Sequence, residues 1–281
     1  MKTAFVLSGG GSLGSVQVGM LIALMENGIF PDLIVGTSVG AINASLIAGD
    51  PTLAGANRLK SIWLQMKRHH IFPSNFKNIF LGIFGHRNHL VSNEGLKSII
   101  RKNLDYTLLE EAKIPIHVIA TEVKSGAEVI LSEGNAVEAI TASAAIPGVF
   151  PPVNFGQDQL VDGGVVNNTP ISYALKLGAE SIWVLPTGYA CDLTSPPDRA
   201  VSMLMHSISL LIQQRLLSDI HANQTNKALH VIPPLCPITT NPTDLSQTKD
   251  YMDRSYQSTI KWLQSSQDLE QALKTLTFHR H

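Results

Sequence analysis

Two strand–turn–helix units follow one another within the first fifty residues, and this repetition limits the fold more than any other feature of the chain. Residues 3–8 form a short apolar run that passes through a glycine-rich turn into a helical pattern at 16–25. Residues 33–35 do the same, through a turn at 36–40, into an apolar helix at 41–48. Strands that alternate with helices usually pair in parallel, so we expect an α/β fold with a mostly parallel sheet.

The rest of the chain continues this alternation without a long linker. Further strands are predicted at 114–121, 128–131, 159–161, 181–185 and 229–232. Helices are predicted at 53–67, 136–143, 170–177 and 198–217, and two polar helices end the chain. In the helix at 198–217, apolar residues recur at helical spacing and are predicted to lie in the core: Met203, Leu204, Ile208, Leu211 and Ile212. We expect one domain over residues 1–281, with a cap inserted at about 55–110.

Composition excludes several classes of protein. Only 15% of the 281 residues are charged, against about 25% in typical soluble domains, which excludes a disordered chain. No repeat is visible, and no apolar run approaches the roughly 18 residues of a membrane-spanning helix. Cys191 and Cys236 are too few for a disulfide framework, and the apolar run after Lys2 meets glycines too early for a signal peptide. These features predict a cytoplasmic protein.

The net charge is −1, but cations concentrate in one basic block, residues 58–102. This block holds nine Lys and Arg against a single acid, Glu94, so it carries +8. Phe76, Phe80 and Phe84 recur at helical spacing inside it. One interpretation is an interfacial helix that contacts an anionic membrane. The alternatives are a buried cap helix and a solvated surface whose cations pair with acids elsewhere. No nucleic-acid partner is predicted.

The turn after the first strand reads GGGSLG over residues 9–14. Consecutive glycines let the backbone approach a ligand closely and expose N–H groups at a helix N-terminus, as a phosphate or an oxyanion requires. A dinucleotide-binding fold needs an acid at the end of the second strand, but Asp32 precedes that strand. A P-loop needs lysine where Ser15 stands. Both nucleotide interpretations are therefore disfavoured.

The second turn reads GTSVG over residues 36–40 and lies between a strand and a helix. In this context, G-x-S-x-G is typical of a nucleophile elbow, a sharp turn that exposes the serine hydroxyl. Gly36 and Gly40 remove side chains that would block the turn, and the following helix directs its positive end at developing negative charge. Ser38 is therefore the predicted nucleophile.

Ser38 needs a base, and one candidate is a histidine. His206, His221 and His230 follow in the second half of the chain. His206 lies within a helical pattern and His230 within a strand pattern, and none of the three stands at a strand–loop junction. A structural role is the simpler interpretation of each histidine.

The other candidate base is Asp162, which ends a predicted strand and is followed by Gly163 and Gly164. The glycines turn the chain tightly behind the carboxylate. An ordinary aspartate, with a pKa near 3.9, is a weak base at neutral pH, and a short direct hydrogen bond to Ser38 would compensate. Taken alone, however, Asp-Gly-Gly is also typical of a plain turn.

Together, the glycine-rich first turn, the G-x-S-x-G second turn and the later Asp-Gly-Gly resemble the patatin-like phospholipase family. The segment ASAAIPGVFP at 142–151 is similar to that family's proline-bearing loop before the aspartate. The resemblance implies a three-layer α/β/α sandwich and hydrolysis of acyl esters, in phospholipids, lysophospholipids, glycerolipids or small model esters. It implies neither a metal nor another cofactor. It makes Ser38 the nucleophile, Asp162 the general base of a Ser–Asp dyad, and Gly9, Gly10 and Gly11 the oxyanion donors, with motif positions at Gly14, Gly36, Gly40, Gly163 and Gly164.

One departure from the family pattern is Leu13, where members usually carry Arg or Lys. The loss of that cation bears on a preference for phospholipids more than on hydrolysis. Two alternatives stay open: a catalytically silent lipid-binding or scaffold protein on the same fold, and a Ser–His–Asp hydrolase. The expected partner is a lipid or small ester substrate, with peripheral contact between residues 58–102 and an anionic membrane. The sequence predicts no oligomeric state.

Overall fold

The computed structural model places the two opening units at the centre of one sheet. The structure describes residues 1–67, 71, 88–193, 196–198, 200–223, 225–226, 228–239, 244–265 and 269–277. In this part of the chain, the eight-stranded sheet has the order β5-β6-β3-β2-β1-β7-β8, with β4 paired to β3. The strands are β1 (Thr3–Leu7), β2 (Leu33–Thr37), β3 (Ile116–Glu122), β4 (Glu128–Leu131), β5 (Val153–Phe155), β6 (Asp158–Asp162), β7 (Ser181–Leu185) and β8 (Leu229–Val231).

The centre of the sheet is parallel, and one end of it is antiparallel. β1 pairs in parallel with β2 and β7, and the parallel order continues to β3 and β8. β4 and β6 run antiparallel to β3, and β5 runs antiparallel to β6. The expectation of a mostly parallel sheet is therefore confirmed. β5, which the sequence pattern does not predict, adds an edge strand of three residues.

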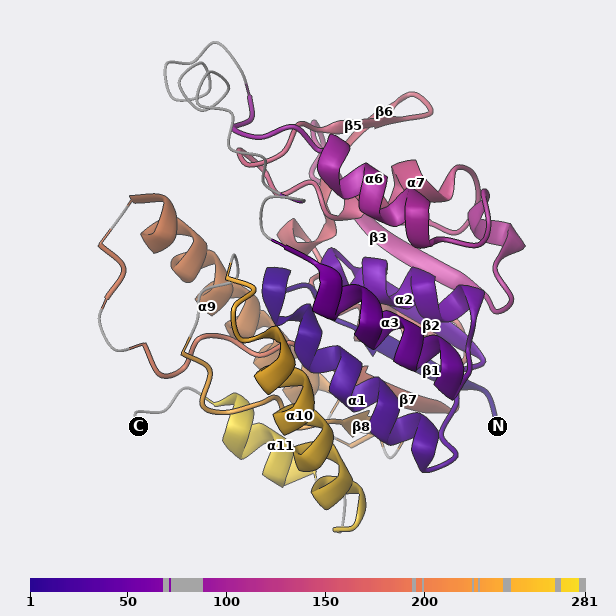
Figure 1. Cartoon of the computed structure of the whole chain (residues 1–281), viewed down its shortest axis with the longest axis vertical. Coiled ribbons are helices and arrows are strands. Elements are labelled where there is room, and N and C mark those ends of the chain that lie inside the picture. Colours follow the sequence, from indigo (N-terminus) through magenta and orange to yellow (C-terminus); the bar gives the residue numbers. More distant parts are fainter. Residues whose placement is uncertain are drawn as a thin grey trace.

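Side chains of the central strands alternate between two hydrophobic cores, one on each face of the sheet. In β1, Phe5 and Leu7 belong to the larger core, whereas Ala4 and Val6 belong to the smaller one. The larger core is covered by α1 (Gly14–Glu26), α2 (Val39–Gly49), α3 (Leu53–Gln65), α6 (Glu94–Asn103), α7 (Ala136–Ser143) and α10 (Thr248–Leu263). The opposite face is covered by α8 (Ile171–Lys176), α9 (Ala200–Ala222) and α11 (Leu269–Leu276), of which Figure 1 labels α9 and α11. The molecule is thus the expected three-layer α/β/α sandwich. Single turns of 3-10 helix occur at η1 (Gly11–Leu13), η2 (Leu109–Glu111) and η3 (Gly163–Val165).

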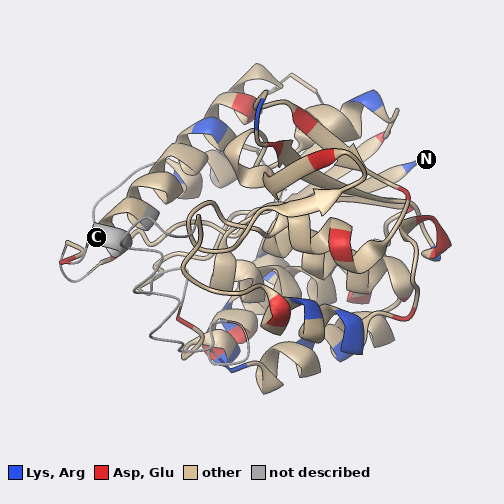
Figure 2. Ribbon diagram, turned by 90° about the horizontal axis from the view of Figure 1, so that it is seen from above, with Lys and Arg blue, Asp and Glu red and all other residues tan. Residues whose placement is uncertain are grey.

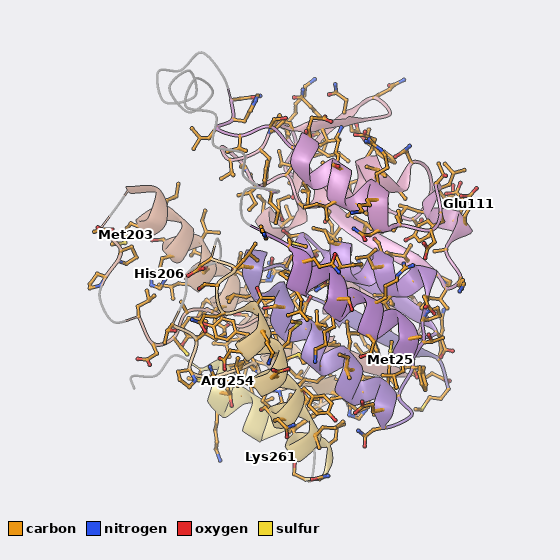
Figure 3. The ribbon with its side chains drawn as sticks, in the orientation of Figure 1. Met25, Glu111, Met203, His206, Arg254 and Lys261 are labelled. Atoms are coloured by element: carbon orange, nitrogen blue, oxygen red, sulfur yellow. The ribbon has the colours of Figure 1, made fainter. Side chains whose placement is uncertain are left out.

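The first half of α9 contradicts the predicted core stripe. α9 has 23 residues and is about 34 Å long at 1.5 Å per residue, whereas the five residues of β7 span about 17 Å. Only the second half of the helix therefore lies over the sheet, where Leu216, Leu217 and Ile220 are buried. The first half extends beyond the sheet with exposed apolar side chains (Figures 1 and 3), at Met203 (43%), Leu204 (61%), Ile208 (37%) and Leu211 (70%). Helical spacing shows which residues share a face, and it does not show whether a partner covers that face.

The predicted insertion at 55–110 joins the larger core at both of its ends. Trp63 of α3 and Ile100 of α6 are buried there. The aromatic residues Phe76, Phe80 and Phe84 lie outside the described residues. The cap and its interfacial helix therefore stay predictions.

Several cations of the basic block pair with acids from other parts of the chain. Figure 2 shows Lys and Arg interspersed with Asp and Glu over the molecule. Within the described part of the block, three ion pairs form: Arg58 with Asp105 at 2.6 Å, Lys60 with Asp253 at 3.4 Å and Lys97 with Glu138 at 2.9 Å. These pairs favour the interpretation of a solvated surface for that part. No helix within the described residues has the length and apolar character that crossing a membrane requires.

Candidate active site

The sheet brings the ends of β2 and β6 together along one edge of β3. Thr37, the last residue of β2, pairs with Ile119, and Asp162, the last residue of β6, pairs with the next residue, Ala120. β4 pairs with the same stretch of β3 and so occupies its other edge. β2 and β6 therefore meet end to end. Ser38, which follows β2, lies beside Asp162 although 124 residues separate them.

Ser38 adopts a left-handed backbone conformation, with φ 56° and ψ −126°. Among the described residues, it alone has a positive φ without being glycine. Such a conformation costs roughly 1–3 kcal/mol and persists only where neighbours hold it. The Ser38 N–H donates to Ser143 Oγ at 2.8 Å, and the Ser143 hydroxyl donates to the carbonyl of Ile119 at 2.5 Å. The Ser38 carbonyl accepts the N–H of Ala41 at 2.9 Å. These contacts hold Ser38 in the elbow, at the N-terminus of α2.

The hydroxyl of Ser38 donates a hydrogen bond of 2.6 Å to Oδ2 of Asp162. Oδ1 of the same carboxyl accepts the N–H of Gly164 at 2.7 Å, which fixes its orientation. Both residues are nearly buried, with 7% of Ser38 and 6% of Asp162 exposed. Burial raises the pKa of Asp162 from 3.8 to about 6, and the hydrogen bonds from Ser38 and Gly164 oppose part of that rise. The carboxyl is therefore mostly ionised at pH 7, yet it holds a proton better than an exposed aspartate does.

The glycine-rich turn lies directly against the elbow. A side chain on Gly9 would come within 3.0 Å of the Ser38 Cβ, so only glycine permits this approach. The N–H of Gly9 donates to the carbonyl of Asn168 at 3.1 Å, and this amide is therefore not available to an oxyanion. The expectation that Gly9 is an oxyanion donor needs this correction. Within the described part of the chain, no group accepts a hydrogen bond from the N–H of Gly10 or Gly11.

The other motif glycines allow close contacts between elements. At each of them an added Cβ would meet a neighbouring atom at 3.0 Å or less. The nearest atoms belong to Val39 for Gly14, to Gly40 for Gly36, to Leu7 for Gly40, to Ile119 for Gly163 and to Asn168 for Gly164. These glycines therefore set the distance between the two turns, the helix α2 and the strand β3.

Comparison with known proteins identifies the family of the chain. A family model described as patatin-like phospholipase matches residues 5–175, which include both turns and the Asp-Gly-Gly segment. The chain belongs to the patatin-like phospholipase family. The match ends in α8, so α9, α10 and α11 lie beyond it.

Curated relatives align with about two thirds of the chain. Patatin-like phospholipase domain-containing protein 7 of Rattus norvegicus is 31% identical over 199 residues, covering 69% of this chain. Lysophospholipase NTE1 of Saccharomyces cerevisiae is 31% identical over 197 residues, covering 67% of this chain. The alignments span only 14% of the rat protein and 11% of the yeast protein. The similarity therefore concerns one part of much longer proteins.

Solved structures confirm the patatin-like fold. VipD from Legionella pneumophila superposes with a TM-score of 0.50 and 16% identity, covering 94% of this chain and 66% of that one. Human GIVD cytosolic phospholipase A2 superposes with a TM-score of 0.53 and 11% identity, covering 98% of this chain and 60% of that one. At these identities, the likeness is one of fold alone.

The departure at Leu13 has a structural counterpart in this patatin-like protein. The Leu13 side chain is 2% exposed and belongs to the larger core. The position that usually carries a cation beside the glycine turn is therefore apolar and buried. A phosphate group at the turn would find no cation at this position.

A buried network of hydrogen bonds, which sequence reasoning missed, holds the strand end that precedes the glycine turn. The amide Nε2 of Gln17 donates to the carbonyls of Ser8 and Leu185, at 2.8 and 2.9 Å. Asn43 donates to Gln17 Oε1 at 2.9 Å and accepts from the Trp63 indole at 2.9 Å. This network ties the ends of β1 and β7 to α1, α2 and α3. The sequence feature that could have predicted this network is a glutamine and an asparagine within two mainly apolar helices.

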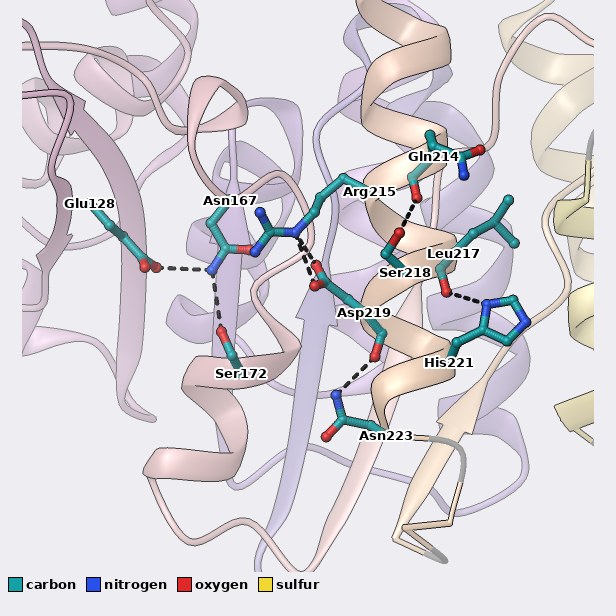
Figure 4. A network of polar contacts seen from close by, with 10 residues as sticks. All are labelled: Glu128, Asn167, Ser172, Gln214, Arg215, Leu217, Ser218, Asp219, His221 and Asn223. Carbon is teal, nitrogen blue, oxygen red and sulfur yellow. Dashed lines mark hydrogen bonds and ion pairs between the residues drawn. The ribbon is translucent and has the colours of Figure 1, made fainter.

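Asn167 and Asn168, which sequence reasoning also missed, contact both turns. The Thr37 hydroxyl donates to the Asn167 carbonyl at 2.9 Å, and the Asn168 carbonyl accepts the Gly9 N–H. The Asn167 side chain donates to Glu128 at 3.0 Å and to Ser172 at 3.5 Å (Figure 4). The sequence feature that could have predicted these contacts is the position of the two asparagines, a few residues after Asp-Gly-Gly.

Of the three histidines considered as bases, His221 and His230 have structural contacts instead. Nδ1 of His221 lies within hydrogen-bonding distance of the Leu217 carbonyl oxygen, at 2.8 Å (Figure 4). The His230 ring stacks on the Trp183 ring, with 4.4 Å between the ring centroids. His206 lies on the half of α9 that extends beyond the sheet (Figure 3). In the described parts of the chain, no histidine bonds to the Ser38 hydroxyl or the Asp162 carboxyl. Nor do those parts bring together three His, Cys, Asp or Glu side chains as a metal ion would need.

Proposed function

We propose that this protein is a serine hydrolase of lipid acyl esters that uses a Ser38–Asp162 dyad. The observation that carries the proposal is the 2.6 Å hydrogen bond from a strained, buried serine to a buried aspartate. Family membership supports ester hydrolysis as the type of reaction.

Ser38 Oγ attacks the ester carbonyl while Asp162 Oδ2 takes the hydroxyl proton. The tetrahedral intermediate collapses to an acyl-enzyme, and Asp162 returns its proton to the leaving alcohol. Water then attacks the acyl-enzyme while Asp162 takes a proton from it, and Asp162 returns that proton to Ser38 Oγ as the fatty acid leaves. A pKa of about 6 suits both roles, because the carboxylate is ionised at pH 7 and still binds the transferred proton usefully.

The proposed oxyanion hole consists of the Gly10 and Gly11 amides. They lie at the start of η1, beside the elbow, where the positive ends of the following helical turns favour negative charge. One donor of this kind is worth roughly 10²–10³ in rate. Gly9 contributes by its close approach to Ser38 rather than by its N–H.

Covalent labelling tests the proposal most directly. A fluorophosphonate should label the wild type, and Ser38→Ala should abolish both labelling and turnover while keeping the fold by circular dichroism. Ser61→Ala, an exposed serine in α3, is the matched control and should keep both. Substrates should range from short p-nitrophenyl esters to lysophospholipids and phospholipid vesicles. Undiminished labelling of Ser38→Ala would place the nucleophile elsewhere, and an unlabelled wild type that binds lipid without hydrolysing it would favour the silent lipid-binding protein.

A further inference from the structure

Cys191 and Cys236 meet at the edge of the sheet that carries Ser38. Cys191 follows Leu185, the last residue of β7, by six residues, and Cys236 follows Val231, the last residue of β8, by five. β7 and β8 run parallel to β2 through β1, so the segments after all these strands leave the same edge. The two Sγ atoms are 3.3 Å apart, and both residues are partly buried.

Two hydrogen bonds next to the sulfur contact also hold the two segments together. The N–H of Asp192 donates to the Ile238 carbonyl at 3.2 Å, and the N–H of Ile238 donates to Cys191 Sγ at 3.4 Å. The sulfurs therefore meet because the chain places them together, not because two surface side chains happen to touch. A disulfide requires about 2.05 Å between its sulfurs, so closing the bond brings the two sulfurs and the segments that carry them closer together.

We propose that Cys191 and Cys236 are a reversible disulfide site, whose oxidant is a small-molecule disulfide such as oxidised glutathione. The thiolate of Cys191 attacks one sulfur of the oxidant, forms a mixed disulfide and releases one small thiol. Cys236 then loses its proton to solvent and attacks Cys191 Sγ, which releases the second small thiol. In sum, two protein thiols and one small disulfide give one protein disulfide and two small thiols.

The surroundings of the pair fit this order of attack. Burial, followed by the contact with Cys191, raises the pKa of Cys236 to about 12, and nearby Asp192 adds to the rise. The thiolate is the reactive form of cysteine, so Cys236 reacts slowly with an outside disulfide. It reacts with Cys191 because the two sulfurs are already in contact.

The cross-link would act on the glycine-rich turn through Thr187. Thr187 lies four residues before Cys191, and its hydroxyl donates to the Gly9 carbonyl at 2.7 Å. Its side chain also fills the space that a Gly10 side chain would take. Closing the disulfide draws this segment toward the segment after β8, so we expect the oxidised protein to hydrolyse esters at least about threefold more slowly. This expectation rests on the proposed function, whereas the disulfide itself does not.

Mass spectrometry of the whole chain tests the site without reference to activity. Oxidised glutathione should lower the mass by two hydrogens and join the peptides that contain Cys191 and Cys236, and dithiothreitol should reverse both. The midpoint of thermal unfolding should rise by about 5 °C, because the bond closes a loop that contains α9 and β8. Cys191→Ser and Cys236→Ser should show neither change, and the alanine variants replace any serine variant that fails to fold. A wild type that stays a dithiol, keeps glutathione on both cysteines or dimerises through them would overturn the proposal.

The link to the glycine turn has its own readout. The rate with a short-chain ester should fall on oxidation, return with dithiothreitol and stay constant in Cys236→Ser under the same treatment. An unchanged rate in a protein that mass spectrometry shows to be cross-linked would overturn the link and leave the site established. If no ester is hydrolysed in either redox state, the proposed function fails while the mass and thermal measurements still decide on the disulfide.

Discussion

Around Ser38 and Asp162, polar atoms are buried and held by partners at short range, whereas in the described part of the basic block Arg58 and Lys60 keep their charges partly exposed to solvent. The hydroxyl and the carboxyl of the dyad are each oriented by named hydrogen bonds from neighbouring backbone or side chains. In the block, the side chains of Arg58 and Lys60 are 39% and 37% exposed, although each contacts an acid.

This difference shows which sequence patterns carry functional information. The dyad depends on a small set of residue types at fixed places relative to strand ends, and such places are determined by the fold. A run of cations fixes no geometry, because long side chains on a surface find acids wherever the fold provides them. A high local charge therefore predicts less than a short motif at a strand end.

The largest effect short of removing the nucleophile is expected from Asp162→Asn. Asparagine is nearly isosteric and cannot take the proton of Ser38, so kcat for a short ester should fall on the order of 10³-fold or more. Steady-state kinetics measures this loss. A histidine replacement that caused an equal loss would instead identify a triad.

The same substitution should stabilise the fold. The pKa of Asp162 is raised to about 6 in the folded protein, so an ionised carboxylate costs stability above that pH, and the cost disappears as pH falls toward 4. Asparagine mimics the protonated form. At pH 7 we expect Asp162→Asn to raise the free energy of unfolding by about 2–3 kcal/mol, measured by urea denaturation. A large destabilisation would mean that the lost activity reflects damage to the fold.

The pH profile should give the next largest effect. Protonated Asp162 cannot act as a base, so kcat/KM should be level near pH 7 and fall about tenfold per unit below pH 6. At pH 4.5 the loss should therefore be about thirtyfold. A profile that stays level down to pH 4.5 would contradict the raised pKa of this carboxyl.

A smaller effect, on binding to anionic vesicles, is expected from replacing an aromatic residue of the basic block. Phe80→Asp should weaken sedimentation with anionic vesicles several-fold and spare hydrolysis of a soluble short-chain ester, because the dyad lies elsewhere. Binding by the wild type should weaken as salt rises, since each basic residue near an anionic surface contributes about 1 kcal/mol, screened over roughly 8 Å. A wild type that ignores anionic vesicles at low salt would exclude the interfacial helix. Joint loss of solubility and short-ester activity in Phe80→Asp would indicate a buried cap helix.

The smallest effects should come from the ion pairs of the block. Lys97→Met, which breaks the more buried pair with Glu138, should cost about 1 kcal/mol of unfolding free energy. Lys60→Met, the control in the exposed pair with Asp253, should cost about 0.3 kcal/mol or less. Urea denaturation at low and high salt measures both. Equal losses of unfolding free energy in the two variants would show that burial does not make the Lys97–Glu138 pair stronger than the Lys60–Asp253 pair.

Much of the fold follows from local pattern. The bounds of β4, α7 and β7 agree with the runs at 128–131, 136–143 and 181–185, because apolar alternation and turn residues delimit them. Ser38 and Asp162 were predicted because both stand at strand ends next to glycines. The hydrogen bond between them supports that assignment, and its chemical role stays a prediction.

The rest depends on contacts between distant parts of the chain. The sequence predicts Gly9 to be an oxyanion donor, but its N–H donates to the Asn168 carbonyl. The spacing within residues 9–14 does not reveal this partner. Ser143, which holds the elbow, is an ordinary residue of a helix end in the sequence. The exposed half of α9 carries the same periodic pattern as a buried helix, so the pattern alone could not separate the two.

The end-to-end meeting of β2 and β6 also has a consequence for how the protein folds. β2 lies in the first fifty residues, whereas β6 ends at Asp162, and only β3 aligns the two. Pairings this distant in sequence form slowly, because a long loop must close before any contact rewards it. The first two strand–helix units, β1–α1 and β2–α2, can therefore assemble well before Ser38 and Asp162 come together. During refolding from urea, helical signal should return earlier than ester hydrolysis, which makes enzymatic activity a late reporter of the native state.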